Sequence, residues 1–175
     1  MTGTTELYDD IKVFCENKHK CLHSSYDSFC FLMSAFPEFR SLYYFRLSNK
    51  KYIKKILSFL APPQKCLYIF SDEKCGAGCY IEHGFSTIIS CRRFGKNFRF
   101  NQQVTVGWSK DGCPIIGDNV QIFAGAKVFG SISIGNNVVI GANAVVNKSV
   151  PDNVTVVGVP ARIVKLNGIK VNIPL

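Results

Sequence analysis

The chain has 175 residues, of which 47% are hydrophobic and 19% are charged, and its formal net charge is +9. This length and apolar content predict one domain of ordinary size with a buried core. Residues 1–10 lack the basic start and apolar run of a secretory signal, and no apolar stretch approaches the length of a membrane span. We therefore expect a cytoplasmic protein without a transmembrane segment.

The basic residues are spread along the chain and do not form a stripe. An aromatic RNA-binding signature and a recognition-helix pattern are both missing from the sequence. We therefore expect an anionic small ligand and no nucleic acid. The eight cysteines are also scattered, in a chain with no export signal, so we expect reduced thiols and no disulfide scaffold.

Residues 1–63 are predicted to form a small N-terminal helical region. Within it, Phe39–Leu60 has apolar residues at helical intervals, and Lys50, Lys51, Lys54 and Lys55 occupy the remaining positions. Prolines punctuate this segment on both sides. A solvated basic face is the favoured interpretation, and contact with a membrane surface or a phosphorylated carrier is the alternative.

Residues 64–175 follow a different period. From Ile116 the sequence divides into units of six residues whose first place is always Ile or Val and whose fifth place is always Val, Ala or Ile. The first places are Ile116, Ile122, Val128, Ile134, Ile140 and Val146, and the fifth places are Val120, Ala126, Ile132, Val138, Ala144 and Val150. This period fits neither an α-helix nor an alternating strand. It predicts short strands joined by tight corners and stacked into a solenoid, with both apolar places inside.

The same frame extends toward the N-terminus. Cys75 and Cys79 fall in the first and fifth places of one unit, so we expect both to be small core fillers and not metal ligands. The pairs Phe94 with Phe98 and Phe100 with Val104 obey the same rule and are predicted to lie in the core.

The period breaks once, between Val106 and Ile116, where ten residues replace six. The four extra residues predict a loop that leaves the solenoid. Its sequence, "GWSKDGCPI", includes Lys110 and Cys113.

These residues resemble the hexapeptide-repeat acyltransferases, in the serine acetyltransferase-like branch. The match covers about Ile69 to Lys165, and its most specific pieces are "IEHG" (Ile81–Gly84), "QQVTVG" (Gln102–Gly107), "IFAGAKVFGSISIGNNVVIGANAVV" (Ile122–Val146) and "VPDNVTVVGVPARIVK" (Val150–Lys165). The lead-in "PEFRSLYYFRLSNK" (Pro37–Lys50) is similar to that of family members that O-acetylate sugars of bacterial surface polysaccharides.

The resemblance implies a mainly β fold, a left-handed parallel β-helix with a small N-terminal α-helical region. It also implies a homotrimer with acetyl-CoA in the groove between neighbouring subunits, and no metal. Whether trimers pair through the N-terminal helices is left open. Physical reasoning independently favours a cap on the exposed end of a solenoid and self-association along a face.

The resemblance assigns His83 as the general base that takes the proton of the acceptor hydroxyl. His19 and His23 lie in a polar N-terminal stretch, where a solvated role is expected. Glu82 matches an acidic residue that contacts the acceptor in serine acetyltransferases, and a solvated corner carboxylate is the alternative.

One position departs from the family. The carboxylate that orients the histidine should lie fifteen positions upstream, where this chain has Tyr68. A tyrosine accepts a hydrogen bond but does not stabilise an imidazolium with a full charge. Asp72 and Glu82 are the nearby substitutes, and an unaided base is the third option.

The positions that carry over to acetyl-CoA binding are Gly107, Ala124 and Ala142, with Arg162 and Lys165 as phosphate partners. Small residues suit a thin pantetheine chain that bonds to backbone amides. Tight corners explain the small residues equally well, and the two cations fit a solvated surface.

The sequence leaves three functions open. The leading one is acetyl transfer to a hydroxyl of a sugar or a bacterial polysaccharide precursor, the second is serine O-acetylation, and the third is a non-catalytic assembly protein. In serine acetyltransferases the corresponding loop is longer and brings an Arg-His pair to the amino acid. Here Cys113 takes the place of that histidine, and Lys110 is the only cation available for a carboxylate. Cys113 itself is expected to be a structural thiol, since nothing nearby in sequence would lower its pKa.

Overall fold

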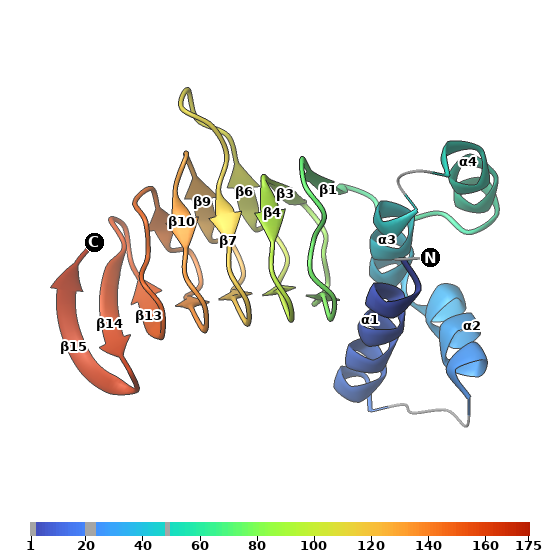
Figure 1. Cartoon of the computed structure of the whole chain (residues 1–175), viewed down its shortest axis with the longest axis horizontal. Helices are drawn as coiled ribbons and strands as arrows, with labels where there is room; N and C mark the ends of the chain where they lie inside the picture. The colour runs from blue at the N-terminus through green and yellow to red at the C-terminus, as the bar shows by residue number, and fades with distance from the viewer. Residues whose placement is uncertain (1–2, 20–23, 48–49) are drawn as a thin grey trace.

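The computed structural model describes residues 3–19, 24–47 and 50–175. A group of helices lies at one end of a β-solenoid, and the chain runs through the helices first and then coil by coil to the far end (Figure 1). In the described part, no helix is both long and apolar enough to span a bilayer.

The helices are α1 (Gly3–Asn17), α2 (Ser25–Ala35), α3 (Pro37–Arg46) and α4 (Lys51–Leu60). Helix α2 begins where the Ser24 hydroxyl accepts a hydrogen bond from Asp27 N at 3.1 Å, and α3 begins at Pro37, whose missing N–H costs nothing in a first turn. His19, just after α1, is exposed, and His23 lies outside the described residues.

The segment Phe39–Leu60, whose apolar spacing is helical throughout, contains two helices and not one. Helix α3 ends at Arg46 and α4 begins at Lys51, and Lys50 N donates to Leu47 O at 2.8 Å between them. Helix α4 then folds back so that its last turn meets Tyr44 of α3, whose hydroxyl donates to two carbonyl oxygens there. Periodicity alone does not reveal this break between helices, because the apolar spacing is the same in both halves of the segment.

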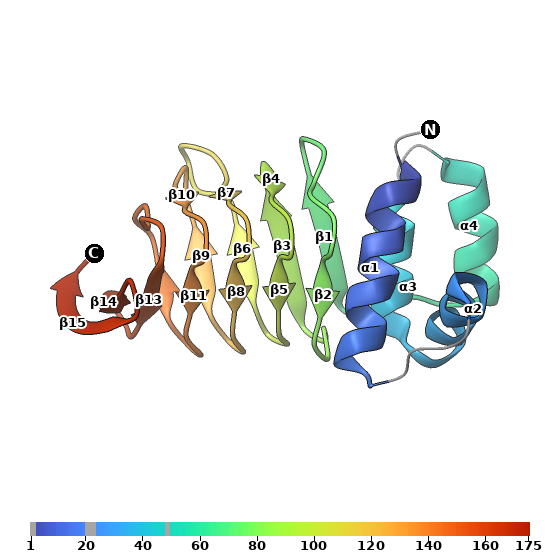
Figure 2. The same cartoon turned by 60° about the horizontal axis from the view of Figure 1, so that its bottom comes forward.

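The strands are short and belong to three sheets that form the faces of the solenoid (Figure 2). They are β1 (Leu67–Ser71), β2 (Tyr80–Ile81), β3 (Thr87–Cys91), β4 (Arg93–Phe94), β5 (Arg99–Phe100), β6 (Thr105–Gly107), β7 (Ile115–Ile116), β8 (Gln121–Ile122), β9 (Lys127–Phe129), β10 (Ser133–Ile134), β11 (Val139–Ile140), β12 (Val145–Val146), β13 (Val154–Val157), β14 (Arg162–Leu166) and β15 (Ile169–Pro174). The sheet orders are β1-β3-β6-β9-β12, β10-β7-β4 and β15-β14-β13-β11-β8-β5-β2, and pairing is parallel up to β13.

The period of six places its apolar residues where the sequence predicts. Ile122 of β8 pairs with Phe100 of β5 on one side and Ile140 of β11 on the other, so equivalent places stack coil upon coil. All first-place and fifth-place residues from Ile116 to Val150 are buried. Cys75, Cys79 and the predicted core phenylalanines are buried as well, which confirms that they are fillers.

One corner of the solenoid is held by a ladder of asparagines. Asn97, Asn119, Asn137 and Asn153 all have φ between 54° and 59°, a left-handed conformation that asparagine tolerates better than most residues. Each side-chain amide of this ladder donates to the next asparagine oxygen at 2.8–2.9 Å. The ladder therefore satisfies polar groups while the chain turns tightly.

A buried ion pair joins the helices to the first coil. Asp10 of α1 is fully buried and accepts from Arg46 of α3 at 2.8 and 3.1 Å and from Cys79 N at 2.8 Å. Arg46 also donates to the carbonyl oxygens of Cys75 and Gly76. Because these backbone groups belong to the open end of the solenoid, the helices act as its cap.

Candidate functional site

His83 stands on a corner between β2 and β3, and its side chain points outward with 62% exposed. The backbone is left-handed at both His83 (φ 64°) and Gly84 (φ 45°). A Cβ at Gly84 would lie 2.9 Å from Ile81 Cγ2 and 3.0 Å from Leu67 Cδ2, so the corner requires glycine there. The sequence "IEHG" thus turns sharply and presents the imidazole to the surface.

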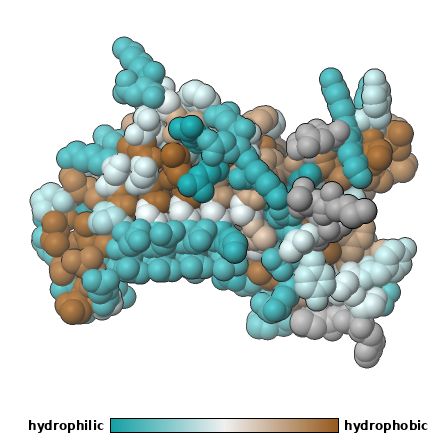
Figure 3. Space-filling model, viewed as in Figure 1, coloured by the Kyte–Doolittle hydropathy of each residue, from teal (hydrophilic) through white to brown (hydrophobic). Residues whose placement is uncertain are grey.

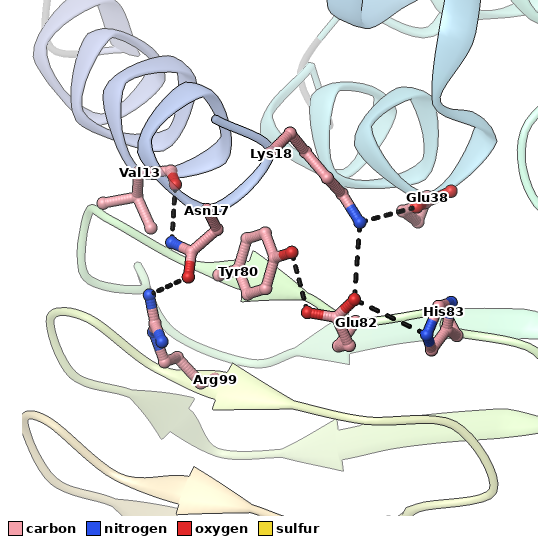
Figure 4. A network of polar contacts seen from close by, with 8 residues as sticks. All are labelled: Val13, Asn17, Lys18, Glu38, Tyr80, Glu82, His83 and Arg99. Carbon is pink, nitrogen blue, oxygen red and sulfur yellow. Dashed lines mark hydrogen bonds and ion pairs between the residues drawn. The ribbon is translucent and has the colours of Figure 1, made fainter. Parts of the chain in front are cut away.

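Glu82 is the carboxylate that meets this imidazole (Figure 4). Its Oε1 lies 3.5 Å from His83 Nε2 and accepts from Lys18 Nζ at 3.4 Å, and its Oε2 accepts from the Tyr80 hydroxyl at 2.8 Å. Lys18 Nζ also lies 4.0 Å from Glu38 Oε1. Glu82 is therefore held on three sides.

The charge state of Glu82 follows from these contacts. Burial raises the pKa of its carboxyl, but the hydrogen bond from Tyr80 and the charge of Lys18 outweigh burial, and the net pKa lies below the ordinary value. Burial, followed by the bond to Glu82, raises the pKa of Tyr80. Glu82 thus carries its negative charge beside the imidazole at neutral pH.

Tyr68, at the position of the family's carboxylate, and Asp72, the other candidate for orienting His83, both lie elsewhere. Tyr68 is on the outer face of β1 and stacks on Phe70, with ring centroids 6.4 Å apart, and it has no hydrogen bond to His83 in the described part of the chain. Asp72 accepts from Cys113 Sγ at 3.6 Å. Of the candidates, the structure brings only Glu82 to the histidine.

Ala124 and Ala142 lie on the same edge of the solenoid as His83. Each stands two residues after a member of the paired row Ile81, Phe100, Ile122 and Ile140, as His83 does. Gln102 takes the equivalent place in the coil between His83 and Ala124. The edge below the imidazole therefore carries small side chains in the later coils.

Gly107 and Lys110 lie at the opposite end of the adjacent sheet. His83 precedes β3, whereas Gly107 is the last residue of β6, the parallel neighbour of β3. The residues after Gly107 leave the solenoid as a projecting loop, as the broken period predicts (Figure 1). Ser109 and Gly112 bond to each other in this loop, and Lys110 at its tip is exposed.

Arg162 and Lys165 both lie on β14 but face different places. Arg162 Nε donates to Asn172 Oδ1 at 2.8 Å, and its side chain borders a cavity of about 250 Å³ that Lys148 and Pro160 also line. Lys165 pairs with Thr155 and lines a separate depression beside the asparagine corner. The structure therefore does not bring these two cations together.

Cys113 is buried at the base of the loop. Burial, followed by the nearby charge of Asp72, raises the pKa of its thiol, which disfavours the reactive thiolate. The burial of Cys113 and its raised pKa both agree with a structural role for this thiol. Among the described residues, no group of three or more His, Cys, Asp or Glu side chains is arranged to hold a metal ion.

Sequence reasoning missed Lys18 and Tyr80, which hold Glu82. Lys18 is 64 positions from Glu82, so no local pattern connects them. A contact between Tyr80 and Glu82 could have been suspected from the sequence, because residues two apart in an extended chain lie on the same side.

Comparison with known proteins places the chain in a family. Residues 113–148 match the family described as bacterial transferase hexapeptide (six repeats). The serine acetyltransferase of Staphylococcus aureus is 37% identical over 131 residues, which cover 71% of this chain and 61% of that protein. That of Staphylococcus xylosus is 41% identical over 127 residues, which cover 69% and 58%.

The solved structures agree. Neisseria gonorrhoeae serine acetyltransferase superposes with a TM-score of 0.73 at 28% identity, over 97% of this chain and 67% of that one. The chain belongs to the hexapeptide-repeat acyltransferases. Within these acyltransferases it lies in the serine acetyltransferase-like branch, and its mainly β, left-handed β-helical fold is as expected. The chain spans about 60% of the length of the curated relatives it matches.

Proposed function

We propose that this chain is an acetyl-CoA-dependent O-acetyltransferase with His83 as its general base. The observation that carries the proposal is an outward-facing imidazole on a rigid left-handed corner, with a charged carboxylate 3.5 Å from one ring nitrogen. Membership of the acyltransferase family supports the same reaction.

In the proposed mechanism, neutral His83 takes the proton of the acceptor hydroxyl as the oxygen attacks the acetyl carbonyl carbon. The tetrahedral intermediate collapses, the carbon–sulfur bond breaks, and the imidazolium returns its proton to the CoA thiolate. Glu82 fixes the ring and stabilises the imidazolium with a full charge, which a tyrosine at position 68 does not supply. Lys18 and Tyr80 keep Glu82 charged and in place.

The site is completed by a second subunit in this proposal. Gly107 and Lys110 lie across a sheet from His83, so one subunit offers its His83 edge and a neighbour offers its loop. The outer face of that sheet supports a homotrimer because it exposes large apolar side chains. These are Tyr68, Phe70, Ile88, Trp108 and Phe129.

Acetyl-CoA would then lie in the groove between subunits, along Gly107, Ala124 and Ala142. Small side chains permit close approach of the pantetheine arm. Because Arg162 and Lys165 face apart, we propose Arg162 as the phosphate partner and assign Lys165 a lesser part. An Arg162→Gln variant would weaken acetyl-CoA binding more than Lys165→Gln, as measured by calorimetry; the reverse order would contradict the assignment.

Serine is the first candidate acceptor. The relatives reported above are serine acetyltransferases, and a second structure of the gonococcal enzyme, 28% identical to this chain, is a complex with serine. These findings favour serine over the sugar hydroxyl that the loop composition favours.

A sugar hydroxyl is the second candidate, because the loop brings one exposed lysine and no arginine to a serine carboxylate. The test is release of free thiol from acetyl-CoA with serine and with a panel of sugars and oligosaccharides. Turnover with serine alone supports the first candidate, and turnover with sugars alone supports the second. No release with any acceptor and no CoA binding would support an assembly protein.

A further inference from the structure

Helix α4 stands apart from the rest of the protein. No residue of Lys51–Leu60 is buried, although the helix carries six apolar residues. Tyr52, Ile56, Phe59 and Leu60 are between 63% and 85% exposed. Leaving such large apolar side chains in water is unfavourable, so we expect a binding partner to cover them.

The two faces of α4 are cleanly separated. At 100° per residue, the apolar residues fall within one half of the helix and the polar residues within the other. The apolar set is Tyr52, Ile53, Ile56, Leu57, Phe59 and Leu60, and the polar set is Lys51, Lys54, Lys55 and Ser58. Figure 3 shows hydrophobic surface exposed in this region, at the upper right, beside projecting hydrophilic side chains.

The attachment of α4 leaves its apolar face open. The Tyr44 hydroxyl donates to Leu57 O at 3.0 Å and to Ala61 O at 2.7 Å. These bonds hold the C-terminal end of the helix through its backbone. Helix α4 is thus fixed in place while most of its apolar side chains remain in solvent.

The charge around α4 identifies the chemistry of its partner. The sequence has no acidic residue from position 39 to position 71, and seven Lys or Arg residues fall in that interval. Arg46 is neutralised by Asp10, but the lysines of α4 form no ion pair among the described residues. A second copy of α4 would bring more positive charge to the same place, which disfavours pairing of this helix with itself.

We propose that α4 docks the protein on the surface of an anionic membrane. The apolar half enters the boundary between headgroups and acyl chains, and the lysines meet the lipid phosphates. A helix of this length and charge lies in the plane of the membrane and does not span it. Helix α4 lies at the helical end of the molecule, away from the solenoid coils, where a membrane could reach it (Figures 1 and 2).

The experiment is co-sedimentation of the full chain with vesicles of phosphatidylcholine alone and with vesicles that contain about a third phosphatidylglycerol. We expect binding to the anionic vesicles only, weakened by salt. The variant Lys51→Gln, Lys54→Gln, Lys55→Gln should bind on the order of 100-fold more weakly, since each lysine near the surface contributes about fivefold. The matched control, Lys12→Gln, Lys96→Gln, Lys170→Gln, removes the same charge from exposed sites elsewhere and should bind as the parent does.

The apolar face is tested by the double variant Ile56→Ser, Phe59→Ser. It should lower vesicle binding at least tenfold, because the variant lacks two large apolar side chains that the parent would bury in the membrane. Ile169→Ser, at a 70% exposed site on the C-terminal hairpin, is the control. Equal binding of the parent to both kinds of vesicle, or no binding, overturns the proposal. The proposal is also overturned if the double variant changes its oligomeric state in analytical ultracentrifugation while it keeps its binding to vesicles. That result would mean that another copy of the chain covers the apolar face.

Discussion

The buried pair between Asp10 and Arg46 offers the sharpest test of how the helices cap the solenoid. Asp10→Ala leaves the Arg46 guanidinium, only 10% exposed, without its anion and leaves Cys79 N without its acceptor. Loss of one partner of such a pair costs about 3–5 kcal/mol, because the remaining charge stays buried. Asp10→Asn should cost less, since its amide oxygen still accepts a hydrogen bond.

The measurement is the free energy of unfolding in urea at one protein concentration, with thermal melting alongside. For a chain of this size the expected loss lowers the melting temperature by about 6–20 °C. The control is Arg92→Ala, which breaks an ion pair with Glu73; both side chains are well exposed, 58% and 43%, so the loss should be at most about 1 kcal/mol. The double variant Asp10→Ala with Arg46→Met should recover part of the loss.

Asp10→Ala could also cost no more than Arg92→Ala, and this outcome would contradict the prediction. That result would mean that the helices dock on the solenoid by apolar packing alone. It would also mean that the bonds from Arg46 to the open backbone contribute nothing measurable.

Three further predictions concern the site and the corners. Because the pKa of Glu82 is lower in the folded protein than in the unfolded chain, its ionised carboxylate stabilises the fold at pH values above the unfolded pKa, and this stabilisation is lost as the pH falls through the folded pKa. The free energy of unfolding, measured across acidic pH, should show this loss in the parent and not in Glu82→Gln. Asn137→Ala removes one rung of the ladder at φ 55° and should lower the free energy of unfolding by about 1–3 kcal/mol, so an unchanged melting curve would contradict it. Cys113→Ser should leave acetyl transfer largely intact, and complete loss of turnover with a native circular dichroism spectrum would assign the thiol a chemical role.

The solenoid core could be predicted from the sequence because each coil repeats the same local requirement. Ile122 and Ile140 are buried for the same reason, and a period of six makes that reason visible. The projecting loop could be predicted equally well, because the four extra residues between Val106 and Ile116 do not fit into the stacked coils. Both are features of neighbouring residues along the chain.

The contacts that define the site depend on distant segments, and no period reports them. Lys18 reaches Glu82 because α1 lies across the first coil, and Asp10 meets Arg46 because α1 packs against α3. One signal was present for Asp10, a charged residue beside the buried positions Ile11 and Phe14 of an amphipathic helix. The division of the segment Phe39–Leu60 into two helices had no such signal, because both halves have the same apolar spacing.

The central claim is that His83 is the base of an acetyl transfer. The most direct measurement is steady-state release of thiol from acetyl-CoA by the parent, His83→Ala and His83→Gln, with serine and then with the best sugar acceptor, beside calorimetric binding of acetyl-CoA. We expect both variants to lose about 10²- to 10⁴-fold in turnover and to bind acetyl-CoA as the parent does. A variant that keeps more than about a tenth of parental turnover would remove His83 from this role.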